Sequence, residues 1–123
     1  MTPVITLLTD FGTADGYVGE MKGVLATLAP GAALVDIAHD VTAHDVEAGR
    51  LAVAHYWHRF PAGTVHLAVV DPGVGGARAA IAVECDGRLL VGPDNGLLSP
   101  ALLWPQARCV SLAVPASAAP TFH

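Results

Sequence analysis

Short apolar runs alternate with helical segments along most of this chain. The apolar runs contain β-branched residues, which favours buried strands. Between the early runs, apolar residues recur at the spacing of one face of a helix. This alternation is typical of the α/β class and predicts a Rossmann-like, mostly parallel sheet flanked by helices. We expect strands at residues 4–8, 33–37, 65–70, 79–84, 88–91 and 110–114, and helices at residues 16–28, 45–59 and 97–103.

Turn and cap residues support these boundaries. Asp15 and Asp45 stand where a side chain could cap the first and second helices. The segment Cys85-Asp-Gly87 separates two apolar runs and predicts a tight hairpin.

Composition excludes several classes of protein. The chain is 53% hydrophobic and only 14% charged, which indicates a well-buried sheet. Its net charge is −5 with six Lys and Arg residues, so we expect no nucleic-acid partner, because binding phosphates needs clustered cations. The sequence contains neither a basic amphipathic face nor an apolar run of the ~18 residues that a transmembrane helix needs, so we expect no membrane association.

The cysteines and the N-terminus bear on location. Cys85 and Cys109 both lie in apolar strand-like runs, which predicts two buried free thiols in a reducing compartment. The first residues have neither a charged region nor a cleavage site, so we expect no signal peptide and a cytoplasmic protein.

The stretch from residue 67 to 78 carries the clearest chemical signal. An apolar run ends at Asp71, a loop with three glycines in four residues follows, and Arg78 closes the segment. Glycines let a backbone approach a ligand closely and point N–H groups toward it. Asp71 and Arg78 would then face a small pocket at a strand end, where open α/β sheets bind ligands. The alternative is a tight turn with a surface ion pair.

A second carboxylate, Asp10, follows the first predicted strand. In a parallel sheet it would share an edge with Asp71. A carboxylate there can accept hydrogen bonds from both hydroxyls of a ribose. The alternative is that Asp10 only caps a turn.

The run from Asp36 to Asp45 contains possible metal ligands, including His39, Asp40 and His44. Its spacing does not match a helical pair of histidines four residues apart, and its acids suit helix caps better. We therefore expect no metal site. Three other histidines are expected to be structural or solvent-facing: His55, His58 and His66.

Five segments together resemble one enzyme family. They are LTDFGTADGYVGEMKG (8–23), DIAHDV (36–41), VVDPGVG (69–75), GPDNGLL (92–98) and TFH (121–123). In this order they resemble the S-adenosyl-L-methionine (SAM) hydroxide adenosyltransferases, the adenosine-forming SAM hydrolases related to fluorinase and chlorinase. Each motif is short, but five in order along nearly the whole chain are specific.

The resemblance implies an activity and an assembly. The family splits SAM into adenosine and L-methionine with water, using no metal or other cofactor. Its members have an N-terminal α/β domain and a smaller C-terminal β-barrel domain, and they form homotrimers with each active site between two subunits. The family continues beyond TFH, so we expect residues 1–123 to be a partial N-terminal domain that is active only in the full-length protein.

The resemblance also implies site residues. The water-activating set would be Asp71, Arg78 and His123, and the ribose-binding acid would be Asp10. His44 and Phe122 would line the SAM pocket. An aspartate at position 71 argues against halogenation, because the halogenating relatives lack it.

Two other functions stay open from the residues alone. One is a non-catalytic nucleoside-binding or assembly module that keeps Asp10 and the glycine loop. The other is a metal-dependent hydrolase that uses the loop of residues 39–45.

Overall fold

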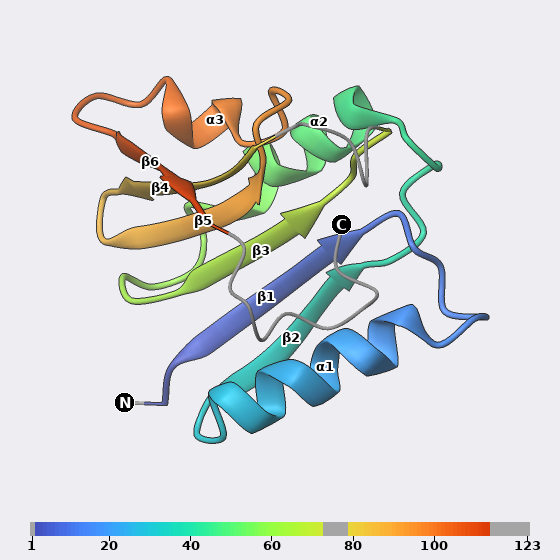
Figure 1. Ribbon diagram of the computed structural model, residues 1–123. Coiled ribbons are helices and arrows are strands. Elements are labelled where there is room, and N and C mark those ends of the chain that lie inside the picture. Colours follow the sequence, from blue (N-terminus) through green and yellow to red (C-terminus); the bar gives the residue numbers. More distant parts are fainter. Residues whose placement is uncertain (1, 73–78, 114–123) are drawn as a thin grey trace.

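A computed structural model describes residues 2–72 and 79–113, which form a six-stranded sheet with helices on both faces (Figure 1). The strand order is β2-β1-β3-β5-β4-β6. Along the chain the elements are β1 (Val4–Thr9), α1 (Tyr17–Leu28), β2 (Ala33–Ala38), α2 (Val46–Tyr56), β3 (Val65–Val69), β4 (Ala80–Cys85), β5 (Arg88–Pro93), α3 (Ser99–Leu102) and β6 (Arg108–Leu112).

The sheet is mixed but mostly parallel, as predicted. β2, β1, β3 and β5 pair in parallel, whereas β4 runs antiparallel to both β5 and β6. Five of the six strands therefore point the same way. The carboxyl ends of β1 and β3 consequently lie side by side at one edge of the sheet.

The predicted hairpin between β4 and β5 is confirmed. Asp86 and Gly87 both have positive φ, at 49° and 78°, as a two-residue type I′ turn requires. The hairpin places β5, rather than β4, next to β3. The strands come so close at Gly92 that an added Cβ would lie 2.4 Å from the carbonyl oxygen of Ala68.

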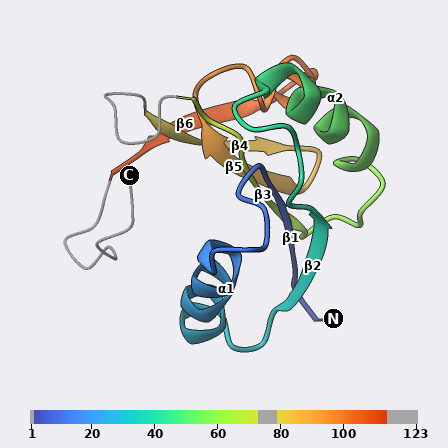
Figure 2. The ribbon, with the colours of Figure 1, turned by 90° about the vertical axis from the view of Figure 1, so that its right-hand side faces the viewer.

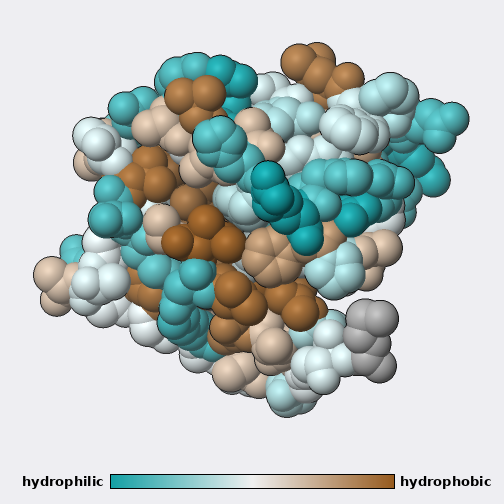
Figure 3. All heavy atoms as spheres, turned by 180° about the vertical axis from the view of Figure 1, so that it is seen from behind, coloured by the Kyte–Doolittle hydropathy of each residue, from teal (hydrophilic) through white to brown (hydrophobic). Residues whose placement is uncertain are grey.

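The main core lies between the sheet and the α2–α3 layer. Val53, Tyr56 and Trp57 at the end of α2 pack with the buried side chains of β3, β4 and β5. α1 covers the opposite face of the sheet (Figure 2). Seen from behind, apolar side chains gather near the middle of the surface, with polar ones around them (Figure 3).

α2 begins with a side-chain cap, whereas α1 does not. Asp45 caps α2 as predicted, since its carboxylate accepts a hydrogen bond from the Ala48 N–H at 3.0 Å. The prediction for Asp15 is wrong: Gly16 occupies the N-cap of α1 with φ of 81°, and no side chain caps the helix. The chain enters α1 through a left-handed residue, whereas side-chain caps typically have extended backbones.

The cysteine prediction is half wrong. Cys85 is buried, but Cys109 is exposed. The reason is its position in β6, the last strand of the sheet, where all five residues are exposed. That strand also begins two residues earlier than expected.

His66 has a structural role, as expected. Its Nε2–H donates to the Trp57 carbonyl at 2.8 Å, and its Nδ1 accepts from the Thr6 hydroxyl at 2.6 Å. Burial of the ring lowers the pKa of His66. Within the described ranges, each helix is too short or too polar to cross a membrane.

Candidate functional site

Asp10 and Asp71 lie at the ends of neighbouring strands. Thr9 is paired with Val69, and the Asp10 N–H donates to the Val69 carbonyl at 3.3 Å. Asp71 follows two residues after Val69, so the shared edge predicted for the two acids is confirmed. Asp71 is buried, with 8% of its surface exposed, whereas Asp10 is only partly buried.

The Asp10 carboxylate is oriented by the main chain of a distant loop. Its Oδ2 accepts a hydrogen bond from the His44 N–H at 2.7 Å. His44 has φ of 64°, a left-handed conformation that turns its amide in the loop before α2. The structure thus brings together two of the predicted substrate-binding residues. A carboxylate fixed in this way keeps lone pairs for a second donor, such as a sugar hydroxyl.

Asp36 and His39, in the 36–45 run, are bound to protein partners. Asp36 forms an ion pair with Lys22 at 2.7 Å and a hydrogen bond with His39 at 2.7 Å. Two hydrogen bonds lower the pKa of the Asp36 carboxyl: the one with His39 has the larger effect and the one with Lys22 the next largest. Across residues 2–72 and 79–113, no three His, Cys, Asp or Glu side chains group as metal ligands would.

Asn95 is a positioning residue that sequence reasoning missed. Its Nδ2 donates to the Val70 carbonyl at 2.9 Å, and its Oδ1 accepts from the Leu97 N–H at 3.1 Å. It therefore ties the turn after β5 to the backbone just before Asp71. The Asn-Gly pair at residues 95–96 signalled a turn, but only the strand order puts that turn beside β3.

Three predicted site residues lie outside the described residues. They are Arg78, Phe122 and His123. The glycine loop from residue 73 onward lies outside them as well.

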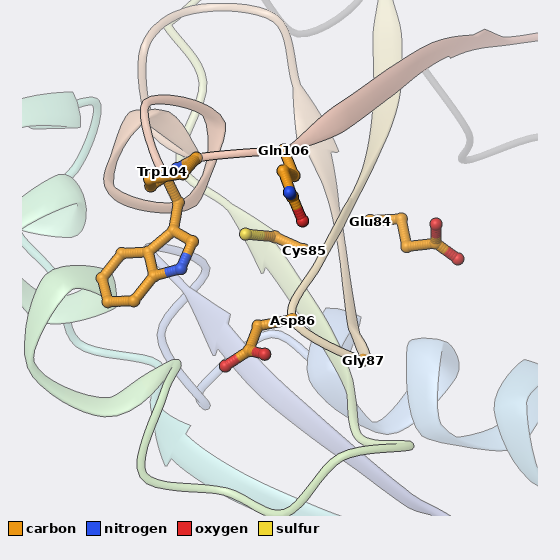
Figure 4. A pocket seen from close by; sticks show the side chains of 7 residues that line it. Glu84, Cys85, Asp86, Gly87, Trp104 and Gln106 are labelled. Carbon is orange, nitrogen blue, oxygen red and sulfur yellow. The ribbon is translucent and has the colours of Figure 1, made fainter.

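A cavity of about 380 Å³ opens at the other end of the sheet (Figure 4). Cys85, Asp86 and Trp104 help to line it, next to the turn that joins β4 to β5. Because β5 is parallel to β3, this turn lies at the amino end of β5, away from Asp10 and Asp71. The cavity is therefore separate from the strand-end site.

Comparison with known proteins identifies the family of this chain. Residues 5–123 match the family described as SAM hydroxide adenosyltransferase N-terminal domain. The chain belongs to this family. A (R)-S-adenosyl-L-methionine hydrolase from Salinispora arenicola is 54% identical over 97 residues, which cover 79% of this chain and 37% of that protein.

Two further relatives show how far the sequence similarity extends. A (R)-S-adenosyl-L-methionine hydrolase from Thermus thermophilus is 48% identical over 94% of this chain and 45% of that protein. A fluorinase from Actinoplanes is 34% identical over 67% of this chain and 28% of that protein.

Solved structures of related proteins share the fold. A conserved hypothetical protein from Thermus thermophilus superposes with a TM-score of 0.82 at 45% identity, over 94% of this chain and 48% of that one. An uncharacterized conserved protein from Thermotoga maritima gives a TM-score of 0.83 at 33% identity, over 89% of this chain and 43% of that one. The chain thus spans less than half the length of these relatives.

Proposed function

We propose that this chain is the nucleoside-binding part of an enzyme that hydrolyses SAM to adenosine and L-methionine. One observation carries the proposal: the Asp10 carboxylate, oriented by the His44 N–H, lies at the strand edge that also holds Asp71. The family match and the names of the hydrolase relatives support the choice of substrate.

In this proposal Asp10 binds the ribose. Its carboxylate accepts hydrogen bonds from the 2′ and 3′ hydroxyls, which is the interaction that a fixed acceptor pair makes with a diol. His44, from the loop that orients Asp10, and Phe122 line the remaining SAM pocket. Binding the ribose places C5′ toward Asp71.

The proposed reaction is an in-line displacement at C5′. A water oxygen forms a bond to C5′ while the C5′–S bond breaks, and the bonding pair leaves on sulfur to give the neutral thioether of methionine. The water proton passes to Asp71 or His123, and Arg78 favours the hydroxide-like nucleophile. Because a sulfonium is already a good leaving group, the protein mainly has to hold the water in line.

We also propose that the full-length enzyme is a cytoplasmic homotrimer that needs no metal or other cofactor. Its active sites would lie between the α/β domain of one subunit and a C-terminal β-barrel domain of the next. The family resemblance supports this arrangement, and the short span of this chain relative to its relatives agrees with it. Sedimentation of the full-length protein tests the trimer.

The decisive experiment follows the oxygen atom. Full-length protein is incubated with SAM in ¹⁸O-labelled water, and the products are analysed by mass spectrometry. We expect methionine without label and adenosine with one ¹⁸O at the 5′ hydroxyl. Label in the amino-acid product would contradict attack at C5′. Binding of adenosine without any turnover would favour the alternative of a non-catalytic nucleoside-binding module.

A further inference from the structure

We propose that His39 is a positioning residue: it holds residues 10–12 in place and thereby sets the direction of the Asp10 carboxylate. The inference rests on the proposed role of Asp10 in ribose binding. It assigns a purpose to the 36–41 motif, which the proposed chemistry does not use.

The bonds of the His39 ring define its tautomer. Nε2 lies 2.7 Å from Oδ1 of Asp36, and Nδ1 lies 2.8 Å from Oγ1 of Thr9. Because a carboxylate only accepts hydrogen bonds, Nε2 carries the proton. In the neutral ring, Nδ1 is then an acceptor for the Thr9 hydroxyl.

The Thr9 hydroxyl links the His39 ring to the loop of residues 10–12. While it donates to His39, the same oxygen accepts from the Phe11 N–H at 3.2 Å. The His39 carbonyl independently accepts from the Gly12 N–H at 2.7 Å. The residues on both sides of Asp10 are therefore linked to His39. Thr9 and Phe11 are linked to its ring, the latter through the Thr9 hydroxyl, and Gly12 is bound to its carbonyl.

Burial protects these hydrogen bonds from competition by water. Thr9 is fully buried and His39 has 8% of its surface exposed, so water does not readily replace either partner. The outer part of the network is different: Asp36 is 45% exposed, so its ion pair with Lys22 contributes little stability. Asp36 instead fixes the ring orientation and tautomer of His39, as carboxylates do for functional histidines.

The consequence is a preorganised acceptor. Recognition of a diol requires the carboxylate to face two hydroxyls at once, and a mobile loop would have to be ordered on binding. With Thr9, Phe11 and Gly12 linked to His39 and the Asp10 Oδ2 bound to the His44 N–H, the loop is ordered before the sugar binds. A purely structural role for His39 would change stability but not the preference for one sugar over another.

The test measures sugar preference in the full-length protein by calorimetry. Affinities for adenosine and 2′-deoxyadenosine are compared in His39→Phe, Thr9→Val, Thr9→Ser and Asp10→Asn, with His55→Phe as the matched control on the exposed side of α2. We expect His39→Phe and Thr9→Val to reduce the preference for adenosine about tenfold. Thr9→Ser keeps the hydroxyl and should retain the preference, as should His55→Phe.

The outcomes separate the two proposals. If Asp10→Asn abolishes the preference while His39→Phe and Thr9→Val retain it, the ribose contact stands and the positioning role of His39 is overturned. If Asp10→Asn retains the preference, the ribose contact fails, and the positioning role fails with it. Should His39→Phe not fold, the comparison of Thr9→Val with Thr9→Ser decides the question by itself.

Discussion

Asp71 combines burial with a position at the end of a strand. Only 8% of its surface is exposed, and Asn95 anchors the preceding carbonyl of Val70. Burial and an anchored backbone on its N-terminal side suit a group that must accept a proton from one bound water. At the scale of single residues, this makes Asp71 the sharpest test of the proposed chemistry.

We predict that Asp71→Asn in the full-length protein lowers kcat by about 10²–10⁴, the usual effect of losing a positioned general base. Adenosine affinity, measured by calorimetry, should change little because Asp10 is intact. Asn95→Ala, which removes the hydrogen bonds to the Val70 carbonyl and the Leu97 N–H without adding a charge, reports the effect of disturbing the backbone alone. A kcat near the parent value for Asp71→Asn would remove Asp71 from the reaction.

His66 leads to a prediction about pH. Burial lowers its pKa in the folded protein below the ordinary value of 6.5, so the unfolded chain takes up the proton first as pH falls. The free energy of unfolding should therefore decrease below about pH 6.5, by up to about 1.4 kcal/mol per pH unit for this group, until the folded pKa is reached. Urea titrations at several pH values, comparing the parent with His66→Gln, measure the difference in slope.

His55→Gln, on the exposed side of α2, is the control for replacing a histidine by glutamine. An identical slope in His66→Gln and the parent would show that another group titrates.

At the scale of elements, the contact between β3 and β5 leaves no room for a side chain at Gly92. A Cβ at Gly92 would lie 2.4 Å from the Ala68 carbonyl oxygen, which is backbone and cannot rotate away. We predict that Gly92→Ala lowers the free energy of unfolding by at least about 1–3 kcal/mol, as overpacking does. Denaturant unfolding is the measurement.

Gly23→Ala is the matched substitution. Gly23 lies in α1, and an added Cβ there meets nothing within 4 Å. It should raise stability by about 0.5–1 kcal/mol, because alanine suits a helix interior better than glycine. If both variants behave alike, the close approach of β3 and β5 is not a constraint.

At the scale of the whole molecule, β6 leaves one side of the sheet open among the described residues. All five of its residues are exposed, including Val110 at 59% and Leu112 at 42%. Uncovered apolar edge strands pair readily with other chains. We predict that the 123-residue chain by itself associates and releases little or no adenosine from SAM.

Light scattering and an adenosine-release assay test both parts of this prediction. Val110→Lys places a charge in the middle of β6 and should reduce the association, whereas Glu84→Gln in the neighbouring β4, which also raises the net charge by one, controls for net charge. A monomer with the turnover of the full-length enzyme would contradict the prediction.

Chelation tests the remaining alternative, a metal-dependent hydrolase. We predict that EDTA leaves the activity of the full-length protein unchanged, because His39, Asp36 and Asp45 are already bound to protein partners. Loss of activity that zinc or manganese restores would favour the metal-dependent reaction.

The sequence by itself determined which elements form and some of their ends, whereas the start of α1, the start of β6 and the end of α2, expected at residue 59 and observed at Tyr56, differ from the prediction. Alternation of apolar runs with helical spacing predicted the strands and helices, since each pattern follows from the period of its own backbone. Asp-Gly predicted the β4–β5 turn and Asp45 predicted the start of α2, because both signals act within a few residues. The placement of Asp10 and Asp71 at one edge followed from the parallel class of the sheet.

Only the tertiary structure decided how distant segments meet. It inserted β5 between β3 and β4, which brought Asn95 to Val70 and left Cys109 on the exposed last strand. It also turned His39 from a possible metal ligand into the partner of Thr9 and Asp36. These contacts depend on strand order and on the direction of each side chain. Both are set by packing of the whole domain, so no pattern within a single segment contains them.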